Sequence, residues 1–307
     1  MLDCHLLARS RNDLFKGSVY LSSQIRTVGI IYNARIPEAL DLSTAIVNEL
    51  SLEQRSWISP AENLEELRDQ VTETELVVTA GGDGTMLRAV QVTAPLDVPM
   101  VGINMGRLGF MTELQVHDAL EKLPSYYRGD YRIDSHNMIM ARIVRAPNSA
   151  TSEVEGPFHA LNDVVLSRGG VSRVVTIRTT VDGAEVASLR ADGIILATAT
   201  GSTGYSLAVG GPILDPLSEG LVLKPVAAHV GMSASLVLDP KAKIGLYLEG
   251  AQEAVLSVDG YIERELQPGD RVEIEQSPFK ARFLRAHPSQ HFYATLTRRL
   301  GFSIRGQ

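Results

Sequence analysis

The sequence contains a single cysteine, Cys4, so no disulfide can form within the chain. The absence of internal disulfides fits a reducing compartment, and we expect a cytoplasmic protein. No apolar run reaches the length of a membrane span, and the apolar residues 6–8 are too few for the core of a signal peptide. We therefore expect a protein with no membrane partner.

The sequence also lacks an excess of basic residues. Its 307 residues include 29 Lys and Arg against 36 Asp and Glu, which gives a formal net charge of −7. A nucleic-acid-binding protein typically shows a basic surplus or a basic stripe, so we expect no nucleic-acid partner. An acidic chain can still bind a phosphorylated ligand when backbone N–H groups and a metal ion form the site.

Two common nucleotide-binding motifs are missing, and so is any zinc-like cluster. There is no G-x-x-x-x-G-K-[ST] segment, which excludes a P-loop enzyme, and no G-x-G-x-x-G after the first expected strand, which disfavours hydride-transferring dehydrogenases. The seven histidines are scattered, and where His287 and His291 fall four residues apart, Pro288 disturbs any helix. We expect no metal site built from protein side chains alone.

What the sequence does contain is a pattern that changes near residue 131. Before it, buried-type apolar runs alternate with helical patterns, which predicts a Rossmann-like parallel α/β domain over residues 27–130. We expect strands at 28–32, 76–80 and 100–103, and helices at 37–51, from Pro60 onward and at 86–92.

After residue 131, short apolar segments are separated by Gly, Pro, Asp and Ser turn signals, which predicts a β-sandwich-like domain over residues 131–285. We expect residues 1–26 to form an N-terminal extension, and residues 286–307 a C-terminal segment whose helix, at 289–300, packs back on the first domain. The expected strands are 139–144, 163–166, 174–179, 193–198, 236–238, 244–248, 255–258, 271–274 and 281–284.

The segment Gly81-Gly82-Asp83-Gly84-Thr85 lies between a buried strand and a helix. Ligands of open α/β sheets bind at the carboxyl ends of strands, where glycines allow close approach and a helix N-terminus offers free N–H donors to phosphate. A carboxylate among phosphates would be repelled by their charge unless it had a specific role. For Asp83 that role is to hold Mg²⁺ or to accept a hydrogen bond from an attacking hydroxyl. The alternative is a tight turn in which Asp83 caps the helix.

Two later segments carry further polar groups. An amide such as that of Asn162, in the pair Asn162-Asp163, can donate and accept, which suits adenine or a ribose hydroxyl, although an isolated pair also fits a turn before a strand. Residues 192–212 run from a strand into Thr, Ser, Gly and Tyr residues. Such a surface suits phosphate and ribose, although an ordinary Gly/Ser/Thr loop has a similar composition.

Together these motifs resemble the NAD kinase family. The glycine motif at 81–85 is shared with diacylglycerol kinases and 6-phosphofructokinases, whereas residues 100–110, 161–163, 192–212 and 257–260 are similar to NAD kinases alone. The resemblance covers residues 27–302 in matching order and spacing. Departures from the family's usual proline, alanine, serine and arginine stand at Ala199, Gly204, Ala208 and Ala234.

The resemblance implies transfer of the γ-phosphate of ATP to the 2′-hydroxyl of the adenosine ribose of NAD. Asp83 would be the catalytic carboxylate, and Arg190 would favour NAD⁺ over NADH as acceptor. The resemblance further implies a divalent metal, Mg²⁺, with ATP, and a homodimer or homotetramer. The phosphates of ATP would contact Gly81, Gly82, Gly84, Thr85 and Arg88. NAD would contact Gly84, Phe110, Asn162, Asp163, Asp192, Thr203, Gly204, Tyr205 and Asp259.

Two alternatives remain at this point. A lipid kinase of the diacylglycerol type would show an apolar or basic membrane-binding face, which the sequence does not indicate, and residues 192–212 argue against it. A non-catalytic homologue that binds NAD or NADP would have no need of a carboxylate beside phosphates, so Asp83 argues against that alternative.

Overall fold

A computed structural model describes residues 27–106, 109–147, 154–170 and 174–301 of the chain. The expected N-terminal extension lies outside the described residues, and so do Arg107 and Leu108 of the segment 100–110. No helix within the described ranges combines the length and the apolar character that crossing a bilayer requires.

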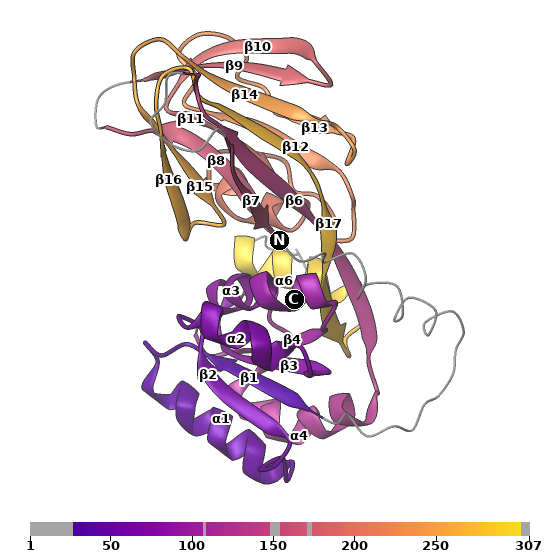
Figure 1. Ribbon diagram of the computed structural model, residues 1–307. Helices are drawn as coiled ribbons and strands as arrows, with labels where there is room; N and C mark the ends of the chain where they lie inside the picture. Colours follow the sequence, from indigo (N-terminus) through magenta and orange to yellow (C-terminus); the bar gives the residue numbers. More distant parts are fainter. Residues whose placement is uncertain (1–26, 107–108, 148–153, 171–173, 302–307) are drawn as a thin grey trace, which may run out of the picture.

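The first half of the chain builds a parallel sheet with helices on both faces, as the alternating pattern predicts (Figure 1). Its strands lie in the order β2-β1-β3-β4, and β1, β3 and β4 are almost fully buried. Helices α1 and α4 cover one face, and α2 and α3 the other. The elements are β1 (Val28–Tyr32), α1 (Pro37–Glu49), β2 (Ser56–Pro60), α2 (Leu64–Val71), β3 (Leu76–Gly81), α3 (Asp83–Thr93), β4 (Met100–Asn104), β5 (Leu114–Gln115) and α4 (Val116–Arg128).

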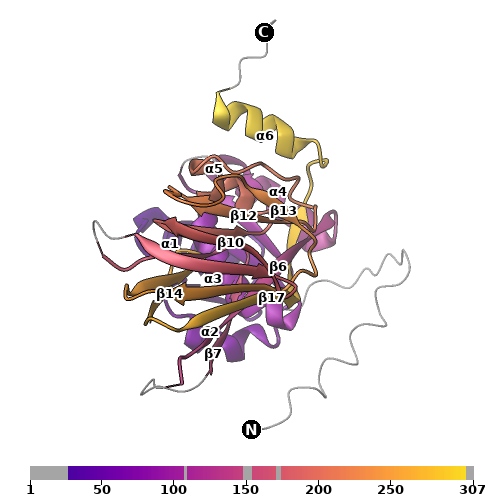
Figure 2. The same ribbon diagram turned by 90° about the horizontal axis from the view of Figure 1, so that it is seen from above.

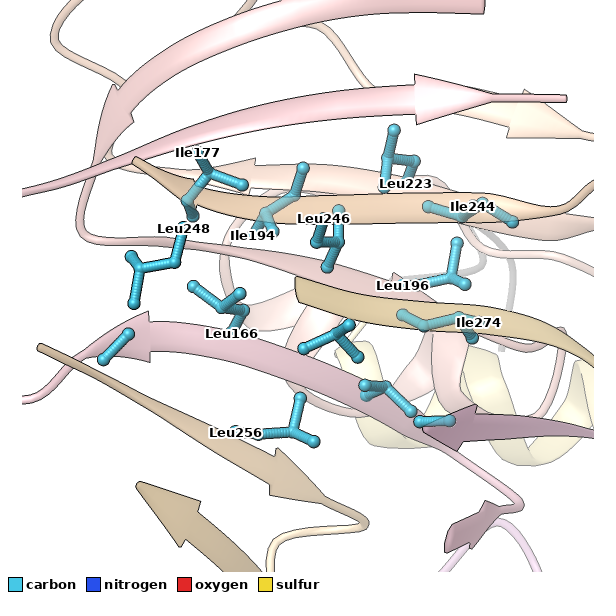
Figure 3. Packing of buried hydrophobic residues seen from close by; sticks show 14 of the residues in the cluster. Leu166, Ile177, Ile194, Leu196, Leu223, Ile244, Leu246, Leu248, Leu256 and Ile274 are labelled. Atoms are coloured by element: carbon cyan, nitrogen blue, oxygen red, sulfur yellow. The ribbon is translucent and has the colours of Figure 1, made fainter. Parts of the chain in front are cut away.

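The second half packs two sheets face to face, as expected for a β-sandwich-like region. Strands β13-β12-β11-β8-β15-β16 form one sheet, and β9, β10 and β14 extend the other. The apolar side chains of both sheets meet in one core, shown in Figure 3. The strands are β6 (Arg132–Val144), β7 (Val154–Ala160), β8 (Asp163–Arg168), β9 (Val175–Val181), β10 (Ala184–Ala191), β11 (Gly193–Ala197), β12 (Leu221–Val226), β13 (Leu236–Leu238), β14 (Ile244–Glu249), β15 (Ala254–Val258), β16 (Ile262–Leu266) and β17 (Arg271–Arg285).

Strand β17 joins the two halves into one continuous sheet. It pairs with β14 and β6 in the sandwich, and its end lies parallel to β4, where Phe283 is opposite Met100. The expectation of two separate strands at 271–274 and 281–284 is therefore wrong. The register shift between Gln276 and Lys280 interrupts the apolar alternation of a single strand.

The expected second helix is present, but its expected start at Pro60 is wrong. Residues Ser56–Pro60 form β2, which pairs in parallel with β1, and α2 begins only at Leu64. The indole N–H of Trp57 donates to the Thr74 hydroxyl at 2.8 Å. This tertiary contact helps to hold β2 in place, although its sequence shows little alternation of apolar and polar residues. Helix α4, which the sequence pattern did not predict, begins with a reciprocal capping box between Gln115 and Asp118.

The C-terminal helix α6 (His291–Leu300) returns to the first half, as expected (Figure 1). Figure 2 shows it at one edge of the molecule. The ring of Phe292 lies 6.1 Å from the ring of Phe110, which follows β4. This return brings α6 to the carboxyl edge of the parallel sheet.

Candidate functional site

Asp83 stands where β3 ends and α3 begins, which is the expected place for a ligand-binding group. Its carboxylate accepts the backbone N–H of Phe110 at 2.9 Å and that of Met111 at 3.1 Å. The Asp83 side chain is 27% exposed, so the same group still reaches solvent. The carboxylate is therefore held from behind by two donors and remains open to a ligand.

Gly109 makes this arrangement possible. A Cβ atom at position 109 would overlap the carboxylate of Asp83. Gly81 has a similar need, because a Cβ there would overlap the hydroxyl of the buried Thr85. By contrast, a Cβ at Gly82 or Gly84 would meet none of the described atoms within 4 Å, so these two glycines leave space on the ligand side of the turn.

A cavity of about 300 Å³ lies against this turn. Five residues expected to contact phosphates or NAD line it, namely Gly82, Gly84, Thr85, Arg88 and Asp259. Asn33, Arg35 and Glu62 also line it, and our sequence reasoning missed them. Asn33 and Arg35 follow directly after β1, so the rule that ligands bind beyond the carboxyl ends of strands could have found them.

Asp259 lines the same cavity, and its side chain also holds the backbone of a neighbouring segment. Its buried carboxylate accepts the backbone N–H of Leu161 at 2.9 Å, of Asn162 at 2.7 Å and of Asp163 at 3.1 Å. Burial raises the pKa of the Asp259 carboxyl to about 7, although the three N–H donors act in the opposite direction. Asp259 therefore fixes the backbone of the Asn162-Asp163 pair.

The pair Asn162-Asp163 packs against the segment after β11. A Cβ at Gly201 would overlap the backbone of Asn162, and a Cβ at Gly204 would lie 3.8 Å from the Asn162 amide nitrogen and 3.9 Å from an Asp163 carboxylate oxygen. Burial raises the pKa of the Asp163 carboxyl to about 6. The hydroxyl of Thr203 donates to the carbonyl of Thr200 at 3.0 Å. Two motifs separated by about 40 residues thus form one polar surface.

Asp192 and Tyr205 line a second cavity of about 390 Å³, together with Arg168. Arg168 pairs with the Asp192 carboxylate at 3.1 Å. The described residues that line this cavity include none that line the first. Arg190 lies exposed on β10, where its backbone bonds with residues 229 and 230. The structure therefore groups Asp192 and Tyr205 with each other and not with Asp83.

The sequence analysis did not predict one further residue near Asp83, which is Arg299. The Arg299 guanidinium of α6 lies 4.2 Å from the centre of the Phe110 ring, and its Nη1 is 3.8 Å from Oδ2 of Asp83. A separation of more than two hundred residues left no local signal for this contact.

Comparison with known proteins adds the family. Residues 53–131 match the ATP-NAD kinase N-terminal domain, and residues 161–286 match the ATP-NAD kinase C-terminal domain. The chain belongs to the NAD kinase family. Among similar NAD kinases, that of Dehalococcoides mccartyi strain CBDB1 is 36% identical, over 90% of this chain and 96% of the relative. That of Chloroflexus aggregans is 35% identical, over 90% of this chain and 99% of the relative.

Two solved NAD kinase family structures share the fold. The yeast NADH kinase complexed with NADH superposes with a TM-score of 0.80 at 21% identity, and covers 93% of this chain and 90% of its own. The NAD kinase from Archaeoglobus fulgidus in complex with ATP has a TM-score of 0.69 at 24% identity, with 90% of this chain and 100% of that chain covered. The parallel α/β half followed by a β-rich half is therefore the fold of this family.

Proposed function

We propose that the protein transfers the γ-phosphoryl group of ATP to the 2′-hydroxyl of the adenosine ribose of NAD, which gives NADP and ADP. The observation that carries the proposal is the Asp83 carboxylate, held by two backbone N–H groups at a glycine turn that opens a helix. A carboxylate fixed at the N-terminal end of a helix is where a phosphate and an acceptor hydroxyl can meet.

The reaction forms a bond between the ribose 2′-oxygen and the γ-phosphorus, and breaks the bond between that phosphorus and the oxygen bridging to the β-phosphate. The 2′-hydroxyl donates a hydrogen bond to Asp83, and its proton passes to that carboxylate as the new bond forms. Because the transition state of phosphoryl transfer is loose, proton removal comes late and positioning supplies most of the catalysis.

The donor phosphates require N–H groups and cations. The first turn of α3 and the open space beside Gly82 and Gly84 offer backbone N–H groups, and Arg88 lines the same cavity. Mg²⁺ is usually held by one or two carboxylates together with substrate phosphates, and no group of three His, Cys, Asp or Glu side chains suited to a metal occurs within the described ranges. Asp83 fits the arrangement in which one carboxylate and the substrate phosphates hold Mg²⁺ together, and the metal would offset the negative charge of the phosphates.

For the acceptor, we propose that Asn162 and Asp163 bind the adenosine of NAD, beside Thr203, Gly204 and Tyr205. Their packing at Gly201 and Gly204 supports this placement, and Asp259 holds their backbone from a position in the lining of the first cavity. Phe110 supplies an apolar surface next to Asp83.

We also propose an active homo-oligomer, a dimer or a tetramer. Asp192 lies in the second cavity, apart from Asp83, so a role for Asp192 toward NAD fits a site that a second copy completes. Analytical ultracentrifugation of the active protein tests this proposal, and a monomer with full activity would contradict it.

The activity is tested with purified protein, ATP, Mg²⁺ and NAD, by following NADP through an NADP-specific dehydrogenase. We expect NADP formation, and loss of that formation in Asp83→Asn. Phosphorylation of diacylglycerol instead would indicate a lipid kinase, and binding of NAD without turnover would indicate a non-catalytic homologue. Either result refutes the proposal.

A further inference from the structure

Helix α6 places a cation on the catalytic carboxylate. Nη1 of Arg299 lies 3.8 Å from Oδ2 of Asp83, and the guanidinium stacks 4.2 Å from the centre of the Phe110 ring. Phe292, seven residues earlier and so on the same helical face, also packs near Phe110, with the two ring centres 6.1 Å apart. One face of α6 is thus directed at Asp83 and at the residue that binds it.

The start of α6 is anchored to the rest of the molecule. The buried carboxylate of Glu113 accepts the backbone N–H of His287 at 2.9 Å and pairs with the imidazole Nδ1 of that residue at 2.7 Å. The Tyr293 hydroxyl donates to Asp215 at 2.7 Å. The Glu113 contacts fix the segment before α6 to the first half of the chain, and the Tyr293 contact fixes the first turn of α6 to the second half, which limits where Arg299 can lie.

The contact between Arg299 and Asp83 contributes little as a stabilising ion pair. The Arg299 side chain is 42% exposed, and a separation of 3.8 Å is longer than a hydrogen bond. The planar guanidinium of arginine presents several N–H donors in a fixed arrangement that matches the oxygens of a phosphate, and Arg299 holds this group over the Phe110 ring beside Asp83. A phosphoryl group that arrives beside Asp83 carries more negative charge than that carboxylate, and so attracts the guanidinium more strongly.

We propose that Arg299 is a catalytic residue that binds the phosphoryl group in transit between donor and acceptor. This proposal rests on the proposed phosphoryl transfer at Asp83. The guanidinium stabilises the negative charge spread over the oxygens of the transferring group, next to the carboxylate that orients the attacking hydroxyl. The C-terminal helix therefore supplies part of the catalytic machinery of the α/β half.

The test compares Arg299→Ala and Arg299→Lys with the matched control Arg298→Ala. Arg298 lies next to Arg299 in the last turn of α6, so its replacement removes the same charge from the same helix end. We expect kcat to fall about 100-fold in Arg299→Ala, as for the loss of one transition-state donor, with KM for NAD changed by less than about threefold. We expect Arg299→Lys to recover part of the loss, and Arg298→Ala to stay within about twofold of the unmodified protein.

A second measurement does not depend on turnover. Calorimetric titration with ADP, Mg²⁺ and aluminium fluoride, in the presence of NAD, reports binding of a mimic of the phosphoryl group in transit. We expect Arg299→Ala to bind it at least about tenfold more weakly than Arg298→Ala, with thermal unfolding of both variants at similar temperatures. A kcat equal to that of Arg298→Ala, equal binding of the mimic, or no binding by the unmodified protein overturns the proposal. Absence of NADP formation by the unmodified protein refutes the proposed function, whereas weaker binding of the mimic in Arg299→Ala reports separately on whether Arg299 contacts the phosphoryl group.

Discussion

Replacing Gly109 by alanine is predicted to inactivate the protein, although the substitution removes no polar side chain. A Cβ at position 109 would overlap the carboxylate of Asp83, so either the carboxylate or the loop that carries Phe110 and Met111 must move. Relief of the overlap requires a shift of about 1 Å, because a new Cβ contact must reach ordinary van der Waals separation. Such a shift moves Asp83 away from the backbone N–H groups that position it.

The expected magnitude follows from the geometry. A misplacement of about 1 Å in a catalytic group lowers the rate by about 100-fold, so we expect kcat of Gly109→Ala to fall by at least that factor. Overpacking at one site destabilises by about 1–3 kcal/mol, which corresponds to a decrease of a few degrees in Tm. The variant should therefore be folded and inactive at 25 °C.

Gly106→Ala is the matched control for this prediction. Gly106 belongs to the same loop, and an added Cβ there would meet none of the described atoms within 4 Å. We expect its kcat to remain within about twofold of the unmodified protein. Steady-state kinetics and thermal unfolding of both variants provide the measurement. If Gly109→Ala retains activity close to that of Gly106→Ala, the close approach to Asp83 is not what positions the carboxylate.

Three further predictions concern charge. Asp83→Asn should lower kcat by about 10²–10⁴-fold, with a small loss of Tm because the amide can accept only one of the two N–H groups; turnover close to wild type would refute the assignment. Arg190→Gly should narrow a preference for NAD⁺ over NADH, measured as the ratio of the two kcat/KM values, and an unchanged ratio would show that Arg190 is not the selector. Burial raises the pKa of the Asp259 carboxyl to about 7, above its ordinary value of 3.8. Between these two values the folded protein holds a proton that the unfolded chain releases. The stability that this proton binding contributes is therefore fully present below about pH 4 and is lost as pH rises through 7. The Tm of the wild type should therefore rise relative to that of Asp259→Asn as pH is lowered from 8 to 5, and a constant difference would contradict the raised pKa.

The parts of the fold that the sequence predicts are those with strong local signals. Strand β3, the glycine turn and α3 follow one another within 20 residues, and both the apolar run and the glycines mark their boundaries. Strand β2 could not be predicted in this way, because Trp57 and Pro60 obtain their strand conformation from pairing with β1. Likewise, the two apolar stretches of β17 look separate until β6 is seen to run beside both.

The same distinction applies to the site. The sequence predicts Asp83 as a polar group after the carboxyl end of a buried strand, and Asn162 as a polar group at the start of a later strand, because local patterns mark both places. The role of Asp259 in holding the backbone was not predicted, since an acidic residue in a turn looks like a ligand-binding group until its three backbone donors are known. The sequence does not distinguish an aspartate that is exposed at the surface from one that holds a loop from the interior, because only the burial of the side chain differs between the two.

The position of Arg299 shows that residues far apart in the sequence meet beside Asp83. Asp83 comes from the α/β half, Gly109 and Phe110 follow β4, and Arg299 arrives on the last helix. Strand β17 explains how the last helix reaches this place, because it leaves the sandwich, pairs with β4 and ends beside Glu113, which holds the segment leading to α6. The long strand that joins the two halves thus also carries the C-terminal helix to the carboxyl edge of the parallel sheet, where a phosphoryl group would meet both Asp83 and Arg299.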